Sequence, residues 1–487
     1  MKLEDILKLQ DEKQKISYLK KRSTDVPNAE SLYEDWDPMK HGVWDKEKRP
    51  DGVKIRQEEV RDSNGKIIQS EEIEPDPVNR ISLPIEQDQV NIHTAFTVGN
   101  EPKLTCAPNN DEETELFAVI KSINKKNKLR FLNKKIVRSW LSECEVAEYW
   151  YVVKDDGFWS KVFARVKSTF GIKTKAEYKL KCAVWSPFRG DKLYPKFDGY
   201  GDFVALSREY STTNDDGTMV GHFMTITVDS VYQWDQDKNW ENPIVFKHGF
   251  KKIPVIYSYR KESLCRNIKP IRERLETLMS NFADCIDFNF FPRLVLEGDI
   301  DGKPTKANGD MIKLHQGGKV SYLTWTQTPE QIKMELESLT DKCYSMTGTP
   351  RISFENLKGT GQALSGVAFD YVFLSTHLKV DEHNEVIGEH LQRRYNFLVS
   401  AIGTINPSYG SASETIEVDC EIQPFRIDDL KSKVEIAVMG FDGGVFSRRT
   451  GVIMAGIADE VEEELKEIEA DNELKEPAVG GAEKPKI

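Results

Sequence analysis

A glycine-rich segment between two long helical patterns constrains this chain more than any other feature. The segment, residues 348–364, combines several glycines with the cations Arg351 and Lys358. Beyond it, apolar residues recur at helical spacing from Ser365, a residue type that caps helices well, as far as Gly403. A helix of this length spans about 55 Å at 1.5 Å per residue. One such helix, opened by a glycine-rich loop, is typical of a subunit in a large assembly and unusual for an enzyme.

Two shorter helical patterns precede the segment and enclose a small β unit. Thr328-Pro329-Glu330-Gln331 forms a capping box with proline at the first helical position, which predicts a helix over 329–347. An earlier apolar stripe predicts a helix over 268–290, which Pro292 ends. Between these helices, apolar runs divided by glycines predict strands at 293–297, 311–314 and 319–323.

The remaining sequence predicts a charged start, an α/β region and a helical end. Residues 1–75 are charged and poorly patterned, and 51–74 indicate an exposed hairpin or arm. Periodicity then predicts helices at 83–97, 111–126 and 129–146, a strand at 149–153, an antiparallel β region at 179–260, a strand at 415–422, and helices at 428–439, after Ser447 and at 459–474. Residues 475–487 contain proline and glycine, and we expect them to be disordered.

A basic amphipathic segment at 157–175 interrupts the α/β region. Phe158, Val162, Val166 and Phe170 lie on one helical face, with lysines and an arginine elsewhere. A helix that docks on a neighbouring sheet or subunit is favoured over a membrane-surface helix, and both interpretations stay open.

The overall charge of the chain is acidic. With 68 basic and 80 acidic residues, its formal net charge is −12. That balance argues against a large basic face wrapped around nucleic acid. It is compatible with an acidic channel through which DNA slides, and equally with acidity that only maintains solubility. Seven cysteines without a Cys-x-x-Cys motif fit a reducing compartment. No run approaches the roughly 20 apolar residues of a membrane span, so we expect a soluble intracellular protein.

The familiar catalytic motifs are missing from the sequence. It contains no Walker-type phosphate loop, no Gly-x-Ser-x-Gly elbow and no His-Glu-x-x-His motif. One conceivable metal site lies on the long helix and comprises His377, His383, His390, Glu382, Glu385 and Glu389. A polar helix face packed against a neighbour explains these residues better. We therefore expect no enzymatic activity, no catalytic residue, no metal and no cofactor.

The order of the predicted elements resembles that of the portal proteins, the head-to-tail connectors of tailed bacteriophages. In that family two stem helices flank a small clip domain, and a tunnel loop then leads into a long helix. Short matches accompany this order, and they are Trp185-Ser186-Pro187, Ser207-Arg208-Glu209-Tyr210, Ile253-Pro254-Val255-Ile256, Ser365-Gly366-Val367-Ala368 and Phe446-Ser447-Arg448-Arg449-Thr450. The ordered set is more specific than any single motif, and it covers residues 75–475.

This resemblance implies an α+β subunit with an α/β wing, a two-helix stem, a small β-containing clip, a long wing helix and a helical crown. The implied boundaries are 1–75 for a charged N-terminal arm, 76–261 for the wing, 262–291 and 329–347 for the stem helices, 292–328 for the clip, 348–364 for the tunnel loop, 365–403 for the long wing helix, 404–474 for the crown and 475–487 for a disordered tail.

The resemblance also implies a ring, usually of twelve copies, at one capsid vertex of a virion, assembled in the host cytoplasm. Double-stranded DNA would pass through it without sequence-specific contacts, near Arg351, Asn356 and Lys358 of the tunnel loop. The stem helices would contact other copies through apolar residues, namely Leu275, Leu278, Phe282, Leu336 and Leu339. The implied partners are the terminase, the major capsid protein and the head-completion or adaptor proteins, with no membrane.

Two alternatives stay open. One is a metal-dependent phage nuclease that uses the histidines and glutamates of the long helix. The other is a different structural virion subunit, such as an adaptor or a capsid protein. Ring formation by the purified protein separates a portal from an enzyme, whereas metal-dependent cleavage of DNA favours the enzyme.

Overall fold

The computed structural model divides the chain into two compact units, each of which is described by itself. Unit 1 comprises Met1–Arg351 and Thr376–Phe425, and unit 2 comprises Ile352–Ser375 and Arg426–Ile487. The structure describes residues 2–61, 67–154, 178–289, 293–297, 300–301, 313–314, 319–323, 329–351, 371, 373–425, 430–456 and 461–475. None of the described helices combines the length and the apolar character that a membrane-spanning segment needs.

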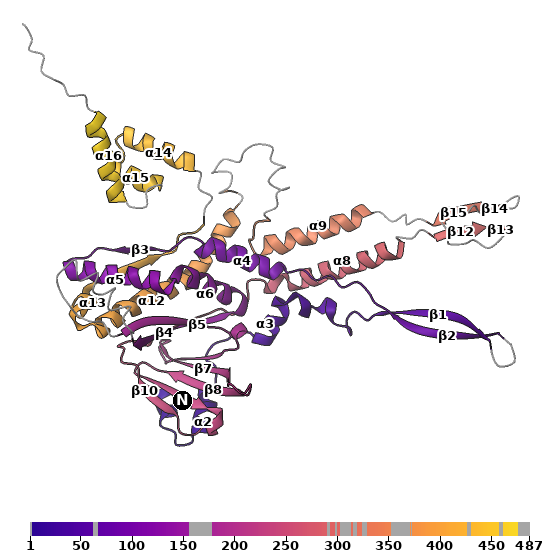
Figure 1. Ribbon diagram of the computed structural model, residues 1–487, viewed down its shortest axis with the longest axis horizontal. Coiled ribbons are helices and arrows are strands. Elements are labelled where there is room, and N and C mark those ends of the chain that lie inside the picture. The colour runs from indigo at the N-terminus through magenta and orange to yellow at the C-terminus, as the bar shows by residue number, and fades with distance from the viewer. Residues whose placement is uncertain are drawn as a thin grey trace, which may run out of the picture. The chain divides into compact units, whose positions relative to one another are not determined.

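Ten α-helices precede residue 426 in the described chain (Figure 1). They are α1 (Leu3–Leu7), α2 (Glu12–Leu19), α3 (Ala29–Trp36), α4 (Ile85–Val98), α5 (Asp111–Asn127), α6 (Leu129–Glu143), α8 (Lys269–Asn289), α9 (Pro329–Met346), α12 (Leu374–Ile405) and α13 (Ala412–Thr415). Local sequence sets many of their ends. At α5, for example, Asn110 Oδ1 caps the amide of Glu113 at 2.8 Å, and three acidic residues follow in the first turn.

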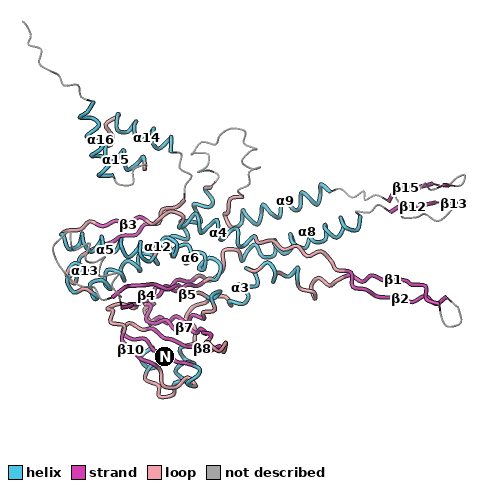
Figure 2. The backbone as a smooth tube through the Cα atoms, in the orientation of Figure 1, coloured by secondary structure: helices cyan, strands magenta, loops and turns pink. Residues whose placement is uncertain are grey.

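The described strands form antiparallel sheets of two, three and five strands (Figure 2). The two-stranded sheets are β1 (Gly52–Arg61) with β2 (Ile67–Asp76), β3 (Lys103–Cys106) with β16 (Val418–Glu421), β12 (Arg293–Glu297) with β15 (Lys319–Leu323), and β13 (Ile300–Asp301) with β14 (Lys313–Leu314). The three-stranded sheet has the order β11 (Val255–Tyr259), β4 (Glu145–Lys154), β5 (Tyr178–Trp185). The five-stranded sheet has the order β10 (Ile244–Lys247), β9 (Ser230–Asp235), β8 (Met219–Ile226), β7 (Phe203–Thr213), β6 (Lys192–Phe197).

Unit 1 builds its core in layers around the three-stranded sheet. Helices α5, α6 and α12 cover one face of this sheet, and the five-stranded sheet covers the other (Figures 1 and 2). Alternation along β4 places Trp150 and Val152 against the helices and Ala147 and Tyr149 against the second sheet. The strand predicted at 149–153 is confirmed within β4, and it packs against other layers on both faces.

The N-terminal residues belong to this core, which corrects the expectation of a charged arm over 1–75. Ile6, Ile16 and Leu19 of α1 and α2 are buried against Phe223 and Trp234 of the five-stranded sheet. Helices as short as α1 and α2 carry too few apolar residues for the sequence to show which surface they pack against. The exposed hairpin predicted nearby is confirmed as the ribbon of β1 and β2, which pair only with each other.

Most predicted elements are confirmed within a few residues. They include the three helices before β4, the antiparallel region from β5 to β11, the helices α8 and α9, and the strands β12 and β15 between them. Several expectations lie outside the described residues. These are the basic segment at 157–175, residues 352–364 of the predicted tunnel loop, the start of the long helix at Ser365, and residues 476–487 of the tail.

The long helix α12 ends at Ile405 instead of Gly403. From Val380 onward its apolar stripe is buried within unit 1. The first part differs, because Leu374 and Leu378 are 52% and 62% exposed in the single chain. An apolar stripe in the sequence indicates that one face of the helix is to be buried. It does not show whether the same chain or another chain buries that face.

Residues 404–425 pack in unit 1, which corrects the predicted start of the crown at 404. Strand β16 pairs with β3, with Val418 opposite Cys106 and Glu421 opposite Lys103. Tyr409 is buried in the same cluster. Local patterns did not reveal this pairing, because the partner strand lies far earlier in the chain.

Unit 2 contains three described helices, α14 (Leu430–Asp442), α15 (Arg448–Ala455) and α16 (Val461–Lys475). The predicted cap at Ser447 is confirmed, since its Oγ accepts a hydrogen bond of 3.2 Å from the amide of Thr450.

A buried ion pair holds α12 on the central sheet. The guanidinium of Arg394 donates from Nε and Nη2 to the carboxylate of Glu148 on β4, at 2.8 and 2.6 Å. His390, one turn earlier, lies 3.2 Å from the same carboxylate, and Trp150 donates to it at 2.6 Å. Arg394 also donates to Asn133 of α6 at 2.6 Å. One carboxylate therefore joins α12 to the central sheet, and its guanidinium partner also reaches α6.

Charge balance keeps Glu148 ionised although it is fully buried. Burial alone would raise the pKa of this carboxyl, but Arg394 and His390 outweigh burial and hold the pKa at about 2. Because this pKa lies below the unfolded value, the ionised pair stabilises the fold at neutral pH. That contribution is lost as the pH falls toward about 2.

Replacing Arg394 with Met should therefore destabilise the chain, because Glu148 would stay buried without its cation. We expect the free energy of unfolding at pH 7 to fall by about 3–5 kcal/mol in a urea titration. The control is Arg393→Met, which removes only an exposed pair with Glu389 and should cost less than about 1 kcal/mol. If both variants lost the same free energy of unfolding, the buried pair would contribute no more to stability than a surface pair.

Candidate functional site

Gly348, just after α9, and Thr376, in the first turn of α12, lie side by side in unit 1. Helix α9 ends at Met346, and Gly348 follows with a φ of +67°, a backbone conformation that favours glycine. The carbonyl oxygen of Gly348 accepts a hydrogen bond of 2.7 Å from Oγ1 of Thr376 in the first turn of α12. The chain therefore leaves α9 and enters α12 at one point of unit 1.

A buried polar cluster anchors this point. Oγ1 of Thr349 lies 3.0 Å from Nε2 of His93 on α4. The ring of His93 meets the ring of His383 on α12 edge to face, with centroids 5.3 Å apart. Burial is the main cause that lowers the pKa of His93 to about 4. Its imidazole is thus neutral at pH 7, and it can hydrogen-bond Thr349 without leaving a charge buried.

Arg351 is the one predicted DNA-proximal residue that the structure describes. Its guanidinium lies 2.6 Å from Oδ1 of Asp341 on α9, and both side chains are exposed. A surface pair of this kind contributes about 0–1 kcal/mol, so the cation can exchange partners at little cost. Asn356 and Lys358 lie outside the described residues. The structure therefore describes only one of the three predicted residues.

The predicted stem residues divide into two groups. Leu275 is buried in a hydrophobic cluster of its own chain, and Leu336 and Leu339 pack against that cluster. These three leucines hold α8 and α9 together. Leu278 and Phe282 are only half-buried in the single chain. They are the remaining candidates for contact with another copy.

A second buried polar network lies at the base of α8, and sequence reasoning missed it. Nδ1 of His41 lies 2.6 Å from the carboxylate of Glu276, and Arg272 lies 3.0 Å from the carboxylate of Glu86 on α4. All four side chains are buried. Burial raises the pKa of Glu86 to about 7 in spite of Arg272. No local signal marks these residues, because polar residues on a helix are ordinarily exposed.

The segment before α4 runs along α8 and adds further bonds to it. The amides of Asn79, Ile81 and Leu83 donate to Asp284, to Oγ of Ser280 and to Glu276, at 2.7, 2.9 and 2.8 Å. Successive backbone groups thus bind successive turns of the helix. This arrangement fixes α8 against the rest of unit 1 on the side away from α9.

The histidines and glutamates of α12 are occupied by packing and surface contacts. His390 belongs to the Glu148 network, and Nδ1 of buried His383 lies 3.4 Å from Oγ1 of Thr97. Glu382 and Glu389 are exposed and pair with cations of the same helix. Within the part of the chain that the structure describes, no group of three or more His, Cys, Asp or Glu could hold a metal ion. This geometry does not favour the nuclease alternative.

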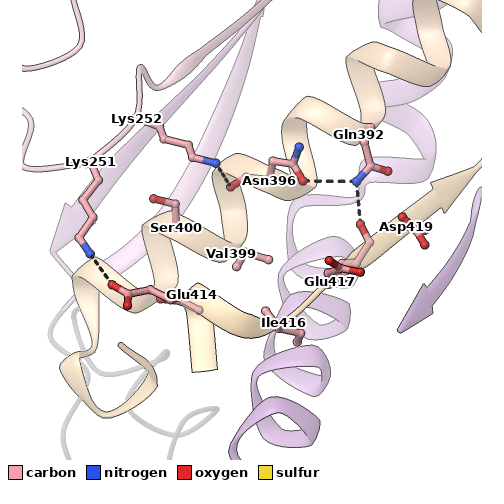
Figure 3. A pocket seen from close by; sticks show the side chains of 12 residues that line it. Lys251, Lys252, Gln392, Asn396, Val399, Ser400, Glu414, Ile416, Glu417 and Asp419 are labelled. Atoms are coloured by element: carbon pink, nitrogen blue, oxygen red, sulfur yellow. Dashed lines mark hydrogen bonds and ion pairs between the residues drawn. The ribbon is translucent and has the colours of Figure 1, made fainter. Parts of the chain in front are cut away.

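A polar groove of about 710 Å³ opens beside α12 (Figure 3). Lys251 and Lys252 line it together with the carboxylates of Glu414, Glu417 and Asp419. Charges of both signs line the groove, so it has no single-sign field that would select a phosphate or a metal ion.

Gln392 explains why the open edge of β16 is stable in this groove. Its side-chain amide donates to the carbonyl of Val418 at 2.7 Å and accepts from the amide of Cys420 at 3.0 Å. These are the two bonds that a neighbouring strand would make. The groove is thus a structural joint between α12 and β16.

Comparison with known proteins gives a consistent family assignment. Residues 53–477 match the family described as phage portal protein, SPP1 Gp6-like. The portal protein of Bacillus phage SPP1 is 24% identical over 256 residues, which cover 50% of this chain and 50% of that protein. The chain thus aligns with about half the length of that curated relative.

Two solved structures are also similar to the chain. They are described as the neck of an empty GTA particle with C6 symmetry and the neck of a native GTA particle with C12 symmetry. Their identities are 10% and 11%, and their TM-scores are 0.43 and 0.38. Each comparison covers 77% of this chain and 90% of that chain.

Replacing Thr376 with Val should loosen the junction of α9 and α12, because the carbonyl of Gly348 would lose its buried donor. We expect a loss of about 1–3 kcal/mol in the free energy of unfolding, measured by urea denaturation. Thr404→Val serves as the control, because Thr404 bonds only the carbonyl of Ser400 within α12. A loss no larger than that of the control would mean that the contact does not hold the two chain ends together.

Proposed function

Because this chain belongs to the SPP1 Gp6-like family of phage portal proteins, we propose that its copies form a ring at one vertex of a phage capsid. Double-stranded DNA enters and leaves the capsid through the axis of this ring. The observation that carries the proposal is the family match, which includes α8, α9, α12 and the small β unit between the first two. Twelve copies, the number usual for portal rings, are part of the proposal.

The family also decides between structural and enzymatic roles. Its members are structural components of the virion, so the expectation that this chain is not an enzyme is confirmed. A virion location follows for the same reason. Assembly in the host cytoplasm, before the capsid is filled, belongs to the proposal.

We assign the parts of a portal subunit to the described elements as follows. Helices α8 and α9 form the stem, and the strands β12–β15 form the clip. The layered sheets with α5, α6 and α12 form the wing, and α14–α16 form the crown. The clip docks the terminase and later the head-completion or adaptor proteins, and the wing faces the major capsid protein.

DNA contact is proposed for Arg351, Asn356 and Lys358. The exposed position of Arg351 and its weak surface pair with Asp341 support transient contact with phosphates. Such contact needs no sequence preference, which a conduit for a whole genome requires. The acidic net charge of −12 supports sliding without tight binding.

Exposed apolar side chains support assembly into a ring. Leu374 and Leu378 of α12 are more than half exposed, and Leu278 and Phe282 of α8 are half-buried. Neighbouring copies would remove these surfaces from water. The first experiment is negative-stain microscopy of the purified protein, in which we expect rings with a central channel. Monomers that cleave DNA with a metal ion would instead favour the nuclease.

Charges placed in the proposed contact should prevent ring formation. We expect Leu278→Asp and Leu378→Asp to abolish rings in sedimentation and microscopy, since each would bury an unpaired carboxylate at every contact. The circular dichroism spectrum of the subunit should stay the same. Thr277→Asp is the matched control on an exposed position of α8. Normal rings from both leucine variants would place the contact elsewhere.

Reversing two cations should impair packaging without affecting assembly. In the variant with Arg351→Glu and Lys358→Glu, we expect rings as usual but shorter packaged DNA in assembled heads. The deficit should shrink at higher ionic strength, because salt screens the repulsion between carboxylate and phosphate. Lys333→Glu, on an exposed position of α9, controls for the change of net charge. Full-length packaging at two ionic strengths would contradict a DNA role for these cations.

A further inference from the structure

The described helices of unit 2 expose apolar side chains and have no hydrophobic core of their own. Seven large apolar residues are between 39% and 75% exposed, and they are Ile436, Val438, Met439, Phe441, Val445, Ile453 and Met454. Of the apolar side chains described in α14, α15 and α16, only Ala437 is buried. None of the four hydrophobic clusters includes a residue of these helices. A domain without a core does not offset the entropy lost on folding, so these helices need a partner surface.

The single copy nevertheless builds a defined hairpin from α14 and α15. A Cβ atom at Gly440 would lie 2.0 Å from the ring of Phe446, so only glycine allows this ring to pack on α14. The amides of Val445 and Phe446 both donate to the carbonyl of Gly440, at 2.9 and 3.1 Å. The exposed apolar residues are therefore presented on an ordered scaffold.

The helices of unit 2 carry opposite charges. Helix α16 contains seven carboxylates and two lysines. Helices α14 and α15 together contain four cations, including Arg448 and Arg449, and two carboxylates. One copy thus carries two surfaces that are complementary to each other. When identical subunits form a ring, complementary surfaces of this kind can form head-to-tail contacts between neighbours.

We propose that α14 and α15 of one copy bind α16 of the next copy, so that the C-terminal helices form a continuous band around the ring. This inference rests on the proposed ring, which supplies an identical neighbour at a fixed distance and so at high effective concentration. The apolar residues of the hairpin supply the buried area, and the charges select the orientation of the neighbour.

Charge reversal on each surface tests the contact in the full-length protein. The first variant is Arg448→Glu with Arg449→Glu, and the second combines Glu463→Lys, Glu464→Lys and Glu467→Lys. In a ring of either variant alone, α14 and α15 of one copy would meet α16 of the next copy with charge of the same sign. We expect the subunit concentration at which half of the protein is in rings to rise about tenfold, as measured by analytical ultracentrifugation. Mixed in equal amounts from dissociated subunits, the two variants should recover rings, with the two chains alternating in native mass spectrometry.

Each outcome decides the inference. Recovery in the mixture supports a contact between copies. If both variants form fewer rings and the mixture does not restore them, the contact lies inside one chain and the inference is wrong. If both variants are half assembled at the same subunit concentration as the wild type, the inference is also wrong, while the proposed function stands. A wild-type protein that forms no rings overturns the proposed function and this inference together.

A second pair of variants tests the apolar part of the contact. Met439 on α14 and Met219 on β8 are 65% and 72% exposed, so a charge at either position leaves the single subunit folded. We expect Met439→Asp to raise the concentration for half assembly and to speed hydrogen exchange of α14 in rings. Met219→Asp should change neither quantity. Identical behaviour of both variants would show that no copy covers the hairpin.

Discussion

The ion pair between Glu148 and Arg394 is the contact on which the arrangement of the long helix depends. It lies between β4 and α12, in layers that are otherwise apolar. Apolar packing alone would tolerate α12 in several rotations and shifts along the sheet. A carboxylate that must meet its guanidinium, with His390 and Trp150 on the same oxygens, allows one position. The rest of α12, including Thr376 beside Gly348, is placed from that position.

Polar networks recur where the helices of the proposed stem and channel leave the layered core. His93 and Thr349 anchor the junction of α9 and α12, and the pairs Arg272–Glu86 and His41–Glu276 lie at the base of α8. Each group is buried, so breaking any of these networks leaves an uncompensated polar atom. Such contacts resist displacement more than apolar contacts do. They suit helices that must hold one direction relative to the layered core.

The single subunit buries the apolar side chains of some layers and leaves those of other elements exposed. The sheets with α5, α6 and the later part of α12 bury a continuous core. In contrast, the first turns of α12 and the hairpin of α14 and α15 leave large apolar side chains exposed. The layered core therefore folds within one chain, whereas these exposed apolar faces need a partner surface. This division is consistent with membership of the portal family.

The sequence alone determined the order of the elements, the two stem-like helices and the resemblance to portal proteins, because helical and strand periods are local properties. Tertiary structure decided the rest. The pairing of β3 with β16 joined residues 404–425 to unit 1, and burial of Ile6 and Leu19 joined the N-terminus to it. Of the five predicted stem residues, Leu275, Leu336 and Leu339 pack within the chain. An apolar stripe records that a face is buried, and only the folded chain reveals which surface covers it.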